Sequence, residues 1–245
     1  MVPILITDSK VQKYLNIILA NQGQSYLVGG YVRDYLLNKT PQDLDIEVYH
    51  LSFTKLQNIF GAEAKIQSNF GVFSLKNTSA EFTIPRKENK IGIKHQDFMI
   101  NLDPNMDLKT AAKRRDFTIN ALMYDIKQNV LLDFYHGQED LKQKQLRHVS
   151  LKFAEDPLRI LRAIRFSAQL GFTIVKETWD LCLKMLPELK YITSERKNQE
   201  IKKFLFTPFA NFKIGFEYFS IVIEQYYDVS LSNFKSSIYL CNIQQ

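Results

Sequence analysis

Residues 27–34 read LVGGYVRD, and residues 43–48 read DLDIEV. The first stretch begins as a short strand pattern, turns at a glycine pair and continues as a helical pattern. Glycines between a strand and a helix let backbone N–H groups approach a phosphate closely. This order predicts that Gly29 and Gly30 form an anion-binding turn, with the positive charge of Arg33 about one helical turn further on.

The second stretch is a strand pattern that begins with two acidic residues. Asp43 and Asp45 are spaced i, i+2, so a strand points both carboxylates toward the same side. Two carboxylates held together at neutral pH need a cation, and oxygen ligands favour Mg²⁺ that also holds substrate phosphates. A lone Asp-x-Asp is usually a loop edge and a lone Gly-Gly a turn, but the two in this order within about 20 residues are far more specific.

In this order the two stretches resemble the nucleotidyltransferase superfamily that includes DNA polymerase beta. The longer form, residues 27–48, resembles the family of class II tRNA nucleotidyltransferases (CCA-adding enzymes) and bacterial poly(A) polymerases. The resemblance implies that Asp43 and Asp45 are catalytic and hold two Mg²⁺ ions. It also implies that the two glycines and Arg33 bind the triphosphate of the incoming nucleotide.

A second motif, RRDFTINAL, occupies residues 114–122. The pattern over residues 109–122 predicts a helix, on which Asp116 and Asn120 are i, i+4 neighbours on one face. A carboxylate and an amide together can grip a ribose, whereas the alternative is an ordinary surface helix with a salt bridge. The segment resembles the family motif whose Arg and Asp contact the sugar and distinguish ribose from deoxyribose. This implies nucleotide-binding roles for Arg115, Asp116 and Asn120.

Residues 155–172 read EDPLRILRAIRFSAQLGF, and we interpret the start of this stretch as a pair of residues that selects the base. On one helix, Glu155 and Arg159 lie i, i+4 and Asp156 and Arg159 lie i, i+3; a salt-bridged helix start is the alternative. Asp accepts and Arg donates, which matches the amino group beside a ring nitrogen in cytosine and adenine and repels the carbonyl of uracil and guanine. The stretch resembles the family motif that acts as an amino-acid template. This implies nucleotide-binding roles for these three residues, with Glu155 holding Arg159 in plane, and for Arg162.

Two further stretches resemble motifs of the same family. LLDFYHGQEDL, at residues 131–141, resembles a hinge that is anchored by its aspartate, Asp133. His136 stands where the family commonly has a second glycine, and we interpret it as a surface loop residue. SERKNQE, at residues 194–200, resembles a motif that supports the helices of the neck, and we favour a structural role for it.

The strands after the metal motif leave two questions open. Glu81 and Glu88 lie on or after a strand beside the metal motif, and the sequence does not decide whether either reaches a metal. Residues 92–107 correspond to a flexible loop of the CCA-adding members. The loop is of full length here, which disfavours a member that adds only the two cytidines.

Composition excludes several classes of protein. Of the 245 residues, 45% are hydrophobic and 24% are charged, which excludes a disordered chain. Two cysteines, Cys182 and Cys241, exclude a disulfide scaffold, and no apolar run of about 18 residues predicts a membrane span. The first residues lack a basic region before their short apolar stretch. We therefore expect no secretory signal and a cytoplasmic location.

The net charge of +6 is unevenly placed. Residues 1–140 carry 16 basic and 16 acidic side chains, whereas residues 141–245 carry 16 basic and 10 acidic side chains. The surplus indicates either a polyanion bound mainly by the second half or a solvated helical surface.

Strand and helix patterns alternate over the first 150 residues, and the rest of the chain is helical in pattern. Predicted strands cover residues 25–28, 44–49, 64–66, 72–75 and 81–84; predicted helices cover 11–19, 31–37, 53–60, 109–122, 153–170, 177–186, 194–206 and most of the last 35 residues. We expect an α+β fold. Residues 1–148 would form a nucleotidyltransferase head, a small mixed sheet flanked by helices as in DNA polymerase beta. Residues 149–245 would form an all-helical neck and truncated body that selects the nucleotide and binds RNA.

The resemblance implies a tRNA nucleotidyltransferase that adds CCA to the tRNA 3′ end without a nucleic-acid template. The RNA 3′-hydroxyl would attack the α-phosphate of CTP or ATP and release diphosphate, with both metal ions assisting. A-only, CC-only and poly(A) addition remain open, and a non-catalytic RNA-binding remnant is the alternative of another class. The expected partners are the tRNA acceptor end, CTP and ATP. The chain ends soon after its last motif, so a homo-oligomer or a partner chain that replaces the family's tail domain stays open.

Overall fold

The computed structural model describes residues 4–90, 98–207 and 209–227. The chain divides into two compact units. The first unit comprises residues 1–143 and 147–155, and the second comprises residues 144–146 and 156–245. The domain boundary expected at residue 148 falls inside the segment where the chain passes between the units.

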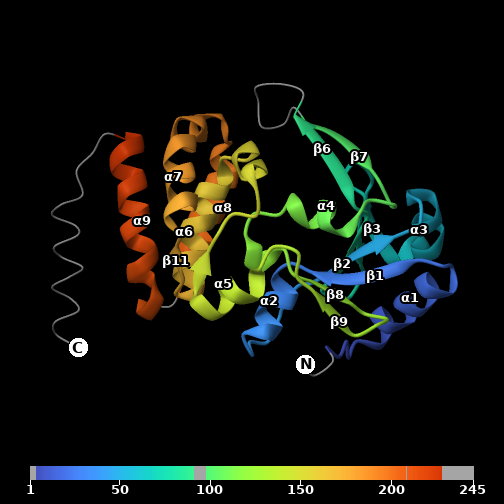
Figure 1. The fold of residues 1–245 in the computed structure, drawn as a ribbon. Helices are drawn as coiled ribbons and strands as arrows, with labels where there is room; N and C mark the ends of the chain where they lie inside the picture. The colour runs from blue at the N-terminus through green and yellow to red at the C-terminus, as the bar shows by residue number, and fades with distance from the viewer. Residues whose placement is uncertain (1–3, 91–97, 208, 228–245) are drawn as a thin grey trace. The chain divides into compact units, whose positions relative to one another are not determined.

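The first unit is built on a mixed sheet of seven strands in the order β3-β4-β5-β2-β1-β8-β9 (Figure 1). β2 pairs with β5 in parallel, and the other neighbours are antiparallel. The strands are β1 (Gln24–Val28), β2 (Leu44–Tyr49), β3 (Ala64–Gln67), β4 (Val72–Leu75), β5 (Ala80–Thr83), β8 (Met123–Asp125) and β9 (Val130–Leu132). The α+β expectation is confirmed, whereas β8 and β9 were absent from the sequence prediction.

Two amphipathic helices cover one face of this sheet. They are α1 (Ser9–Ala20), which Asp8 caps through hydrogen bonds from the N–H groups of Lys10 and Val11, and α3 (Phe53–Phe60). Phe60 of α3 lies with its ring centroid 5.0 Å from that of Tyr14 on α1 and 4.9 Å from that of Phe82 on β5. These aromatic contacts fix the helices on the apolar side of the alternating strands.

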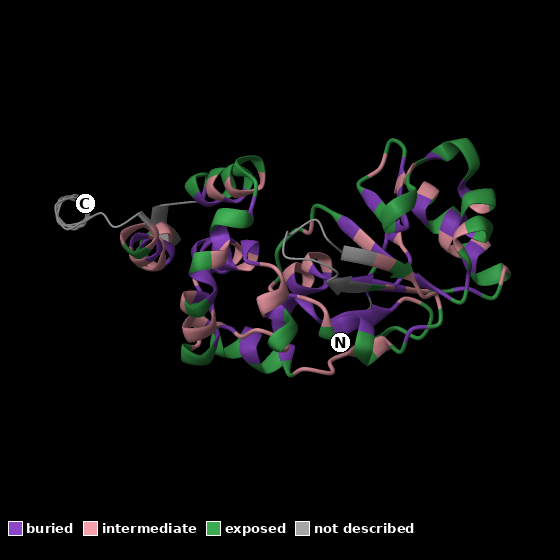
Figure 2. Cartoon of the chain, turned by 90° about the horizontal axis from the view of Figure 1, so that it is seen from above, coloured by how far each residue is buried: buried purple, intermediate pink, exposed green. Residues whose placement is uncertain are grey.

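The opposite face of the sheet carries the motif residues. A buried cluster there joins side chains of β1, β2 and β8 to a short helix, α4 (Leu108–Lys113). The cluster comprises Tyr26, Val28, Tyr49, Met106, Ala111, Ala112, Ala121 and Met123. Purple, buried segments therefore run through the strands in Figure 2. Both faces of the sheet are covered, so polar side chains on the second face lie in partly buried surroundings.

The other elements of the first unit are short. A two-stranded ribbon pairs β6 (Arg86–Lys90) with β7 (Phe98–Leu102), and residues 91–97 of the expected flexible loop lie outside the described residues. The helices are α2 (Gly30–Leu36) and α5 (Gly137–Gln143), with single turns η1 (Gly61–Glu63), η2 (Ser68–Phe70), η3 (Thr118–Asn120) and η4 (Leu151–Glu155).

The continuous helix predicted over residues 109–122 is wrong. α4 ends at Lys113, and a turn and a bend over residues 114–116 lead to the extended residue Phe117 and then to the single turn η3. The Asp116 carboxylate accepts the N–H of the next residue, Phe117, at 2.8 Å, which competes with a helical hydrogen bond. Phe117 is fully buried and forms an isolated antiparallel bridge with His148. A tertiary contact therefore overrides the local helical pattern.

The continuous helix predicted over residues 153–170 is also wrong. Glu155 ends η4, and α6 (Leu158–Leu170) begins only after Pro157. Helical backbone is disfavoured for the residue before a proline, so the helix is interrupted at Asp156. The predicted helix stop at Gly171 is confirmed, because this residue has the left-handed φ of 70° and donates its N–H to Ser167 O.

The second unit is mainly helical. After α6 come α7 (Lys176–Met185), the 3₁₀ helix η5 (Leu186–Tyr191), α8 (Ser194–Leu205) and α9 (Phe209–Tyr227). The sequence analysis did not predict a small pair of parallel strands, β10 (Gln145–Leu146) with β11 (Thr173–Ile174). α6 packs on both α8 and α9. At Gly215 of α9 an added Cβ would lie 2.6 Å from Ala168 Cβ, so the glycine permits a close approach of α9 to α6.

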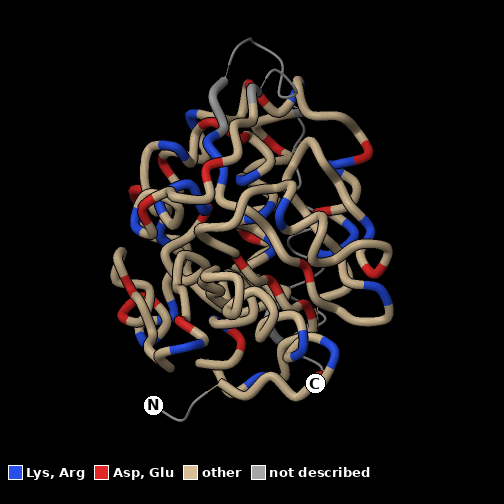
Figure 3. Tube along the Cα trace, turned by 90° about the vertical axis from the view of Figure 1, so that its right-hand side faces the viewer, with Lys and Arg blue, Asp and Glu red and all other residues tan. Residues whose placement is uncertain are grey.

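Charge and hydropathy of the described chain add two observations. Lys and Arg positions lie among Asp and Glu positions along the trace in Figure 3, without a long block of either sign. No helix in the described ranges is both long and apolar enough for a membrane crossing. The predicted helical pattern of residues 228–245, and Cys241 with it, lie outside the described residues.

Candidate active site

A cavity of about 440 Å³ opens at the start of β2 in the first unit. Asp43 immediately precedes β2 and is exposed, and Asp45 is the second residue of the strand and is partly buried. The cavity is lined by Asp43, Asp45, Ser74, Thr78, Ser79, Ala80 and Glu81. The two aspartates thus share one cavity, as their i, i+2 spacing predicts.

Glu81 joins the two aspartates from the neighbouring strand. It is the register partner of Asp45 across the parallel β2–β5 pair, and its Oε1 accepts a hydrogen bond from Ser74 Oγ at 2.8 Å. The other open candidate, Glu88, lies on β6 and its side chain is outside the described residues. Of the two, Glu81 is the carboxylate that lines the cavity.

The electrostatics of the cavity fit a divalent cation. Burial raises the pKa of Asp45 to about 6; Arg115 opposes this shift, while Glu81 and Asp43 add to it. A carboxylate whose ionised form is disfavoured by burial and by like charges gains from a bound cation. Oxygen donors are the ligands that Mg²⁺ prefers, and a small protein ligand set leaves its remaining positions to water and substrate phosphates. Within the described ranges, no group of three or more Asp, Glu, His or Cys side chains is gathered into a metal cage.

The glycine turn at Gly29 lies beside Asp45. Gly29 caps the N-terminus of α2 with φ 69°, a conformation that favours glycine. A Cβ at Gly29 would lie 3.2 Å from Arg115 Nη1 and 3.6 Å from Asp45 Oδ2. The turn, the arginine and the carboxylate therefore surround one small volume that the missing side chain leaves open.

Arg33 is held by the protein. It is 8% exposed, and Nε and Nη2 donate to the two carboxylate oxygens of Asp34, each at 2.8 Å. Nη1 donates to Asn120 Oδ1 at 2.7 Å. At Gly30 an added Cβ would lie 3.4 Å from Arg33 Nη2, so the second glycine makes room for the guanidinium. Arg33 thereby ties α2 to η3.

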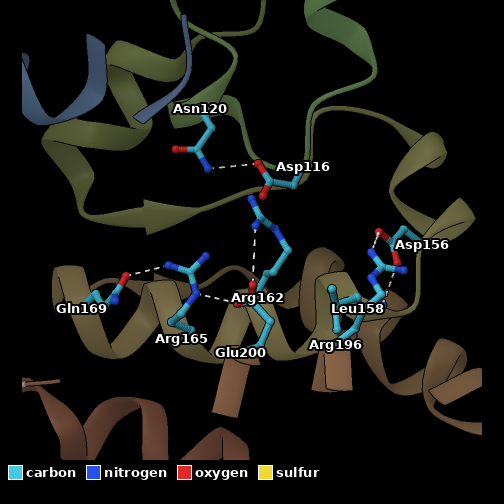
Figure 4. A network of polar contacts seen from close by, with 9 residues as sticks. All are labelled: Asp116, Asn120, Asp156, Leu158, Arg162, Arg165, Gln169, Arg196 and Glu200. Carbon is cyan, nitrogen blue, oxygen red and sulfur yellow. Dashed lines mark hydrogen bonds and ion pairs between the residues drawn. The ribbon is translucent and has the colours of Figure 1, made fainter. Parts of the chain in front are cut away.

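Asp116 and Asn120 form a pair, although not on a helix. Asn120 Nδ2 donates to Asp116 Oδ1 at 2.9 Å (Figure 4), and both residues are 6% exposed. The pairing is as predicted, but it is made between a residue of the bend before Phe117 and the turn η3. The Asn120 amide is thus bonded to Arg33 through its oxygen and to Asp116 through its nitrogen.

Glu47 is a site residue that sequence reasoning missed. It is fully buried on β2, and its Oε1 accepts from Arg115 Nη2 at 2.7 Å and from Arg114 Nη2 at 2.9 Å. Its Oε2 accepts from Tyr49 Oη at 3.0 Å. Burial alone would raise the pKa of Glu47, but the two guanidiniums and the Tyr49 hydrogen bond outweigh burial and lower this pKa. The period-2 pattern Asp43, Asp45, Glu47 was the signal that could have found it.

The third motif organises the loop before α5. Asp133 accepts the N–H groups of Gly137 at 2.8 Å and of Gln138 at 3.0 Å, so it caps the helix that follows. His136 has a φ of 59° in this loop, which explains why the family commonly has glycine there. It is exposed, in agreement with the loop interpretation.

In the second unit, Asp156 is tied to α8. Its Oδ1 accepts the N–H of Leu158 at 3.0 Å, and its Oδ2 lies 3.3 Å from Arg196 Nη2 (Figure 4). Arg159 lies in the first turn of α6 and donates its backbone N–H to Asp156 O at 3.0 Å. Glu155 ends η4 and Asp156 precedes α6, so neither shares a helix with Arg159. The predicted i, i+4 and i, i+3 relations on one helix are therefore both wrong.

A buried charge cluster links α6 to α8. Glu200 is 6% exposed, and its Oε2 accepts from Arg165 Nε at 2.6 Å, while its Oε1 lies 3.8 Å from Arg162 Nη1. Arg165 also donates to Gln169 at 2.8 Å (Figure 4). Arg162, predicted to bind nucleotide, is thus one member of this cluster. The contacts of Arg196 and Glu200 support the structural role favoured for residues 194–200.

Comparison with known proteins places the chain among nucleotidyltransferases. Residues 25–147 match the family described as the poly A polymerase head domain. The chain is 41% identical over 187 residues to a CCA-adding enzyme of Blochmanniella floridana, across 75% of this chain and 45% of that enzyme. It is 42% identical over 188 residues to a multifunctional CCA protein of Pasteurella multocida (strain Pm70), across 75% of this chain and 44% of that protein. The chain thus spans less than half the length of these relatives.

Solved structures give the same likeness. The Bacillus stearothermophilus CCA-adding enzyme in complex with CTP has a TM-score of 0.70 and 29% identity, across 82% of this chain and 49% of that one. The Thermotoga maritima CCA-adding enzyme complexed with tRNA has a TM-score of 0.69 and 26% identity, across 89% of this chain and 52% of that one. The fold class expected from the motifs is therefore the fold of these enzymes.

Proposed function

The chain belongs to the poly A polymerase head-domain family, that of the class II CCA-adding nucleotidyltransferases, and from this premise we propose that it adds CCA to the 3′ end of tRNA. The observation that carries the proposal is that Asp43 and Asp45 share one cavity of the first unit, and that Asp45 lies with Arg115 beside the Gly29 turn. Its substrates are CTP, ATP and the acceptor end of tRNA. The reaction takes place in the cytoplasm.

The nucleotide lies across the turn at Gly29. Backbone N–H groups at the start of α2 and the Arg115 guanidinium bind the triphosphate, and Asp43 and Asp45 hold two Mg²⁺ ions. When bound, these ions lower the pKa of the RNA 3′-hydroxyl and neutralise the phosphates. The 3′-hydroxyl gives up its proton to water, and its oxygen attacks the α-phosphorus in line, so that a new P–O bond forms and the bond to diphosphate breaks.

The sugar and the base are read by separate groups. The buried Asp116–Asn120 pair accepts and donates hydrogen bonds to the ribose, and Arg33 fixes this pair in place. Asp156 and Arg159 read cytosine and adenine, because a carboxylate acceptor beside a guanidinium donor matches both pairing edges. Arg196, within ion-pair distance of Asp156, holds that carboxylate in position. Residues 1–148 supply the catalytic head, and residues 149–245 select the nucleotide and bind RNA.

Transfer to a tRNA transcript that lacks its 3′ CCA tests the proposal. With Mg²⁺, CTP and ATP the product should stop after three additions, and with CTP alone after two. Asp45→Asn should abolish transfer, while Glu63→Gln, which changes an exposed carboxylate beside Lys10, should leave it unchanged. Two additions that ATP does not extend would mean CC addition, continued growth with ATP would mean poly(A) addition, and no transfer to any acceptor would favour an RNA-binding remnant.

A further inference from the structure

A third carboxylate stands on the face of β2 that carries the two aspartates. Asp43, Asp45 and Glu47 alternate along the chain, so their side chains point to the same side of the sheet. By spacing alone Glu47 would extend the metal site. Its surroundings differ, because it is fully buried and does not line the cavity that the two aspartates share.

The hydrogen bonds of Glu47 leave it unsuited to a metal. Oε1 accepts from two guanidiniums, at 2.7 and 2.9 Å, and Oε2 accepts from the Tyr49 hydroxyl at 3.0 Å. A carboxylate oxygen that already holds charge-assisted hydrogen bonds of this length would have to give them up to bind a cation. Glu47 is therefore engaged with the arginines.

Arg115 connects Glu47 to the reaction site. Its Nη2 is anchored on Glu47, and its Nη1 lies 3.2 Å from the place of a Cβ at Gly29. Its Nε is buried and has no hydrogen-bond partner among the residues that the structure describes. The Glu47 contact is thus the charged anchor that sets how the guanidinium is turned toward the glycine turn.

We propose that Glu47 is a positioning residue that orients Arg115 for binding and transfer of the nucleotide. The inference rests on the proposed function and adds a residue to it. Glu47→Gln should lower kcat/KM for CTP by up to about 100-fold, because small misplacements of a positioning group carry losses of this size. It should not weaken Mn²⁺ binding, whereas Asp45→Asn should.

A double-mutant cycle separates positioning from a general structural role. If Glu47 acts through Arg115, Glu47→Gln should have no further effect on kcat/KM in an Arg115→Ala background. Additive losses in the cycle would overturn the proposal, and so would a loss of Mn²⁺ affinity in Glu47→Gln. Glu63→Gln is the matched control, since it also neutralises a carboxylate of the first unit. Should Glu47→Gln fail to fold, Tyr49→Phe replaces it in the cycle, because it removes only the hydroxyl that orients Glu47.

Equilibrium binding of CTP with Mg²⁺, measured by calorimetry, repeats the cycle without any transfer. A wild-type chain that binds CTP but adds nothing to tRNA contradicts the proposed function alone. If the enzyme is active but the cycle shows no coupling between Glu47 and Arg115, the result contradicts the positioning role alone. A chain that neither binds nor transfers contradicts both.

Discussion

Environment, rather than residue type, separates the roles of the three carboxylates on β2. Asp43 is exposed at the cavity mouth, and Asp45 is partly buried with a pKa raised to about 6 by burial and by neighbouring carboxylates. Glu47 is fully buried, yet two guanidiniums lower its pKa. Paired positive charge stabilises a buried carboxylate, while a cavity open to solvent and substrate leaves the other two for a cation. One strand therefore carries both the proposed metal ligands, Asp43 and Asp45, and the residue that anchors Arg115.

Cys182 provides a test of burial in the second unit. It lies fully buried on α7, and burial raises the pKa of its thiol to about 12. In a Cys241→Ser variant, which leaves Cys182 as the single thiol, we expect no reaction with Ellman's reagent at pH 8 until denaturant unfolds the unit. Because only the unfolded thiol ionises near its usual pKa, stability should fall as the pH rises from about 8.5 toward 12. Rapid labelling of the folded protein at pH 8 would contradict this.

The motif residues show what the sequence could and could not predict. Asp43 and Asp45 were predictable because strand alternation is a local rule. The bonds of Glu47 to Arg114 and Arg115 join residues 67 and 68 positions apart, so no spacing rule reaches them. The Asp116–Asn120 contact was predicted for a helix that does not form. The contact is made nevertheless, because the turn at η3 also brings residues i and i+4 together.

At the scale of the element, His136 and Gly137 at the start of α5 differ in what their backbone allows. The φ of His136 favours glycine, and the surroundings of Gly137 leave no room for a side chain. His136 has φ 59°, which costs a non-glycine residue about 1 kcal/mol. His136→Gly should therefore stabilise the first unit by about 1 kcal/mol. Gly137→Ala should destabilise it by about 1–3 kcal/mol, because a Cβ there would lie 2.4 Å from the Thr118 carbonyl oxygen.

Calorimetric unfolding of both variants measures these two effects with one design. The two substitutions change neighbouring residues at the start of α5, so a general sensitivity of this segment would shift both unfolding temperatures downward. Opposite shifts support the backbone argument. A stabilised Gly137→Ala would contradict the close contact with Thr118.

The α6–α8 cluster gives a second prediction for elements. Glu200→Gln leaves the buried Arg165 without its charged partner, so the second unit should lose about 3 kcal/mol. Trp179 is the single tryptophan and packs edge-on against Tyr218 at 4.7 Å, so its fluorescence in a urea titration reports on this unit. Glu195→Gln, an exposed change on the same helix, should shift the midpoint little. Equal shifts in the two variants would show that Glu200 contributes no more than a surface charge.

The helices and strands match the sequence prediction where the interactions that form them lie within the segment itself. β2 and α3 begin and end at the predicted residues, because strand alternation and the Ser52 cap of α3 lie within the segment. The predicted helix over residues 109–122 failed where Phe117 pairs with His148 across the fold. β8 and β9 are three residues each, too short for a periodic signal, and they form by pairing with β1 and with each other.

At the scale of the whole molecule, the two units divide the chemistry. The first holds the aspartates, the glycine turn and the Asp116–Asn120 pair, and the second holds Asp156 and Arg159. The basic surplus lies in residues 141–245, which include the whole of the second unit. Under the proposed function, protein side chains choose the bases that are added, so we expect the RNA to be held mainly through its backbone.

RNA binding should therefore depend steeply on salt. A protein that neutralises several phosphates releases their counterions, so log K should fall with log salt by about 0.7 to 0.9 per phosphate contacted. Fluorescence anisotropy of a labelled tRNA between about 50 and 200 mM KCl measures this slope. Lys202→Gln with Lys203→Gln, two exposed changes on α8, should make the slope shallower. Lys55→Gln with Lys65→Gln, two exposed changes in the neutral part of the chain, should not. Equal slopes in both double variants would place the RNA contacts elsewhere than on α8.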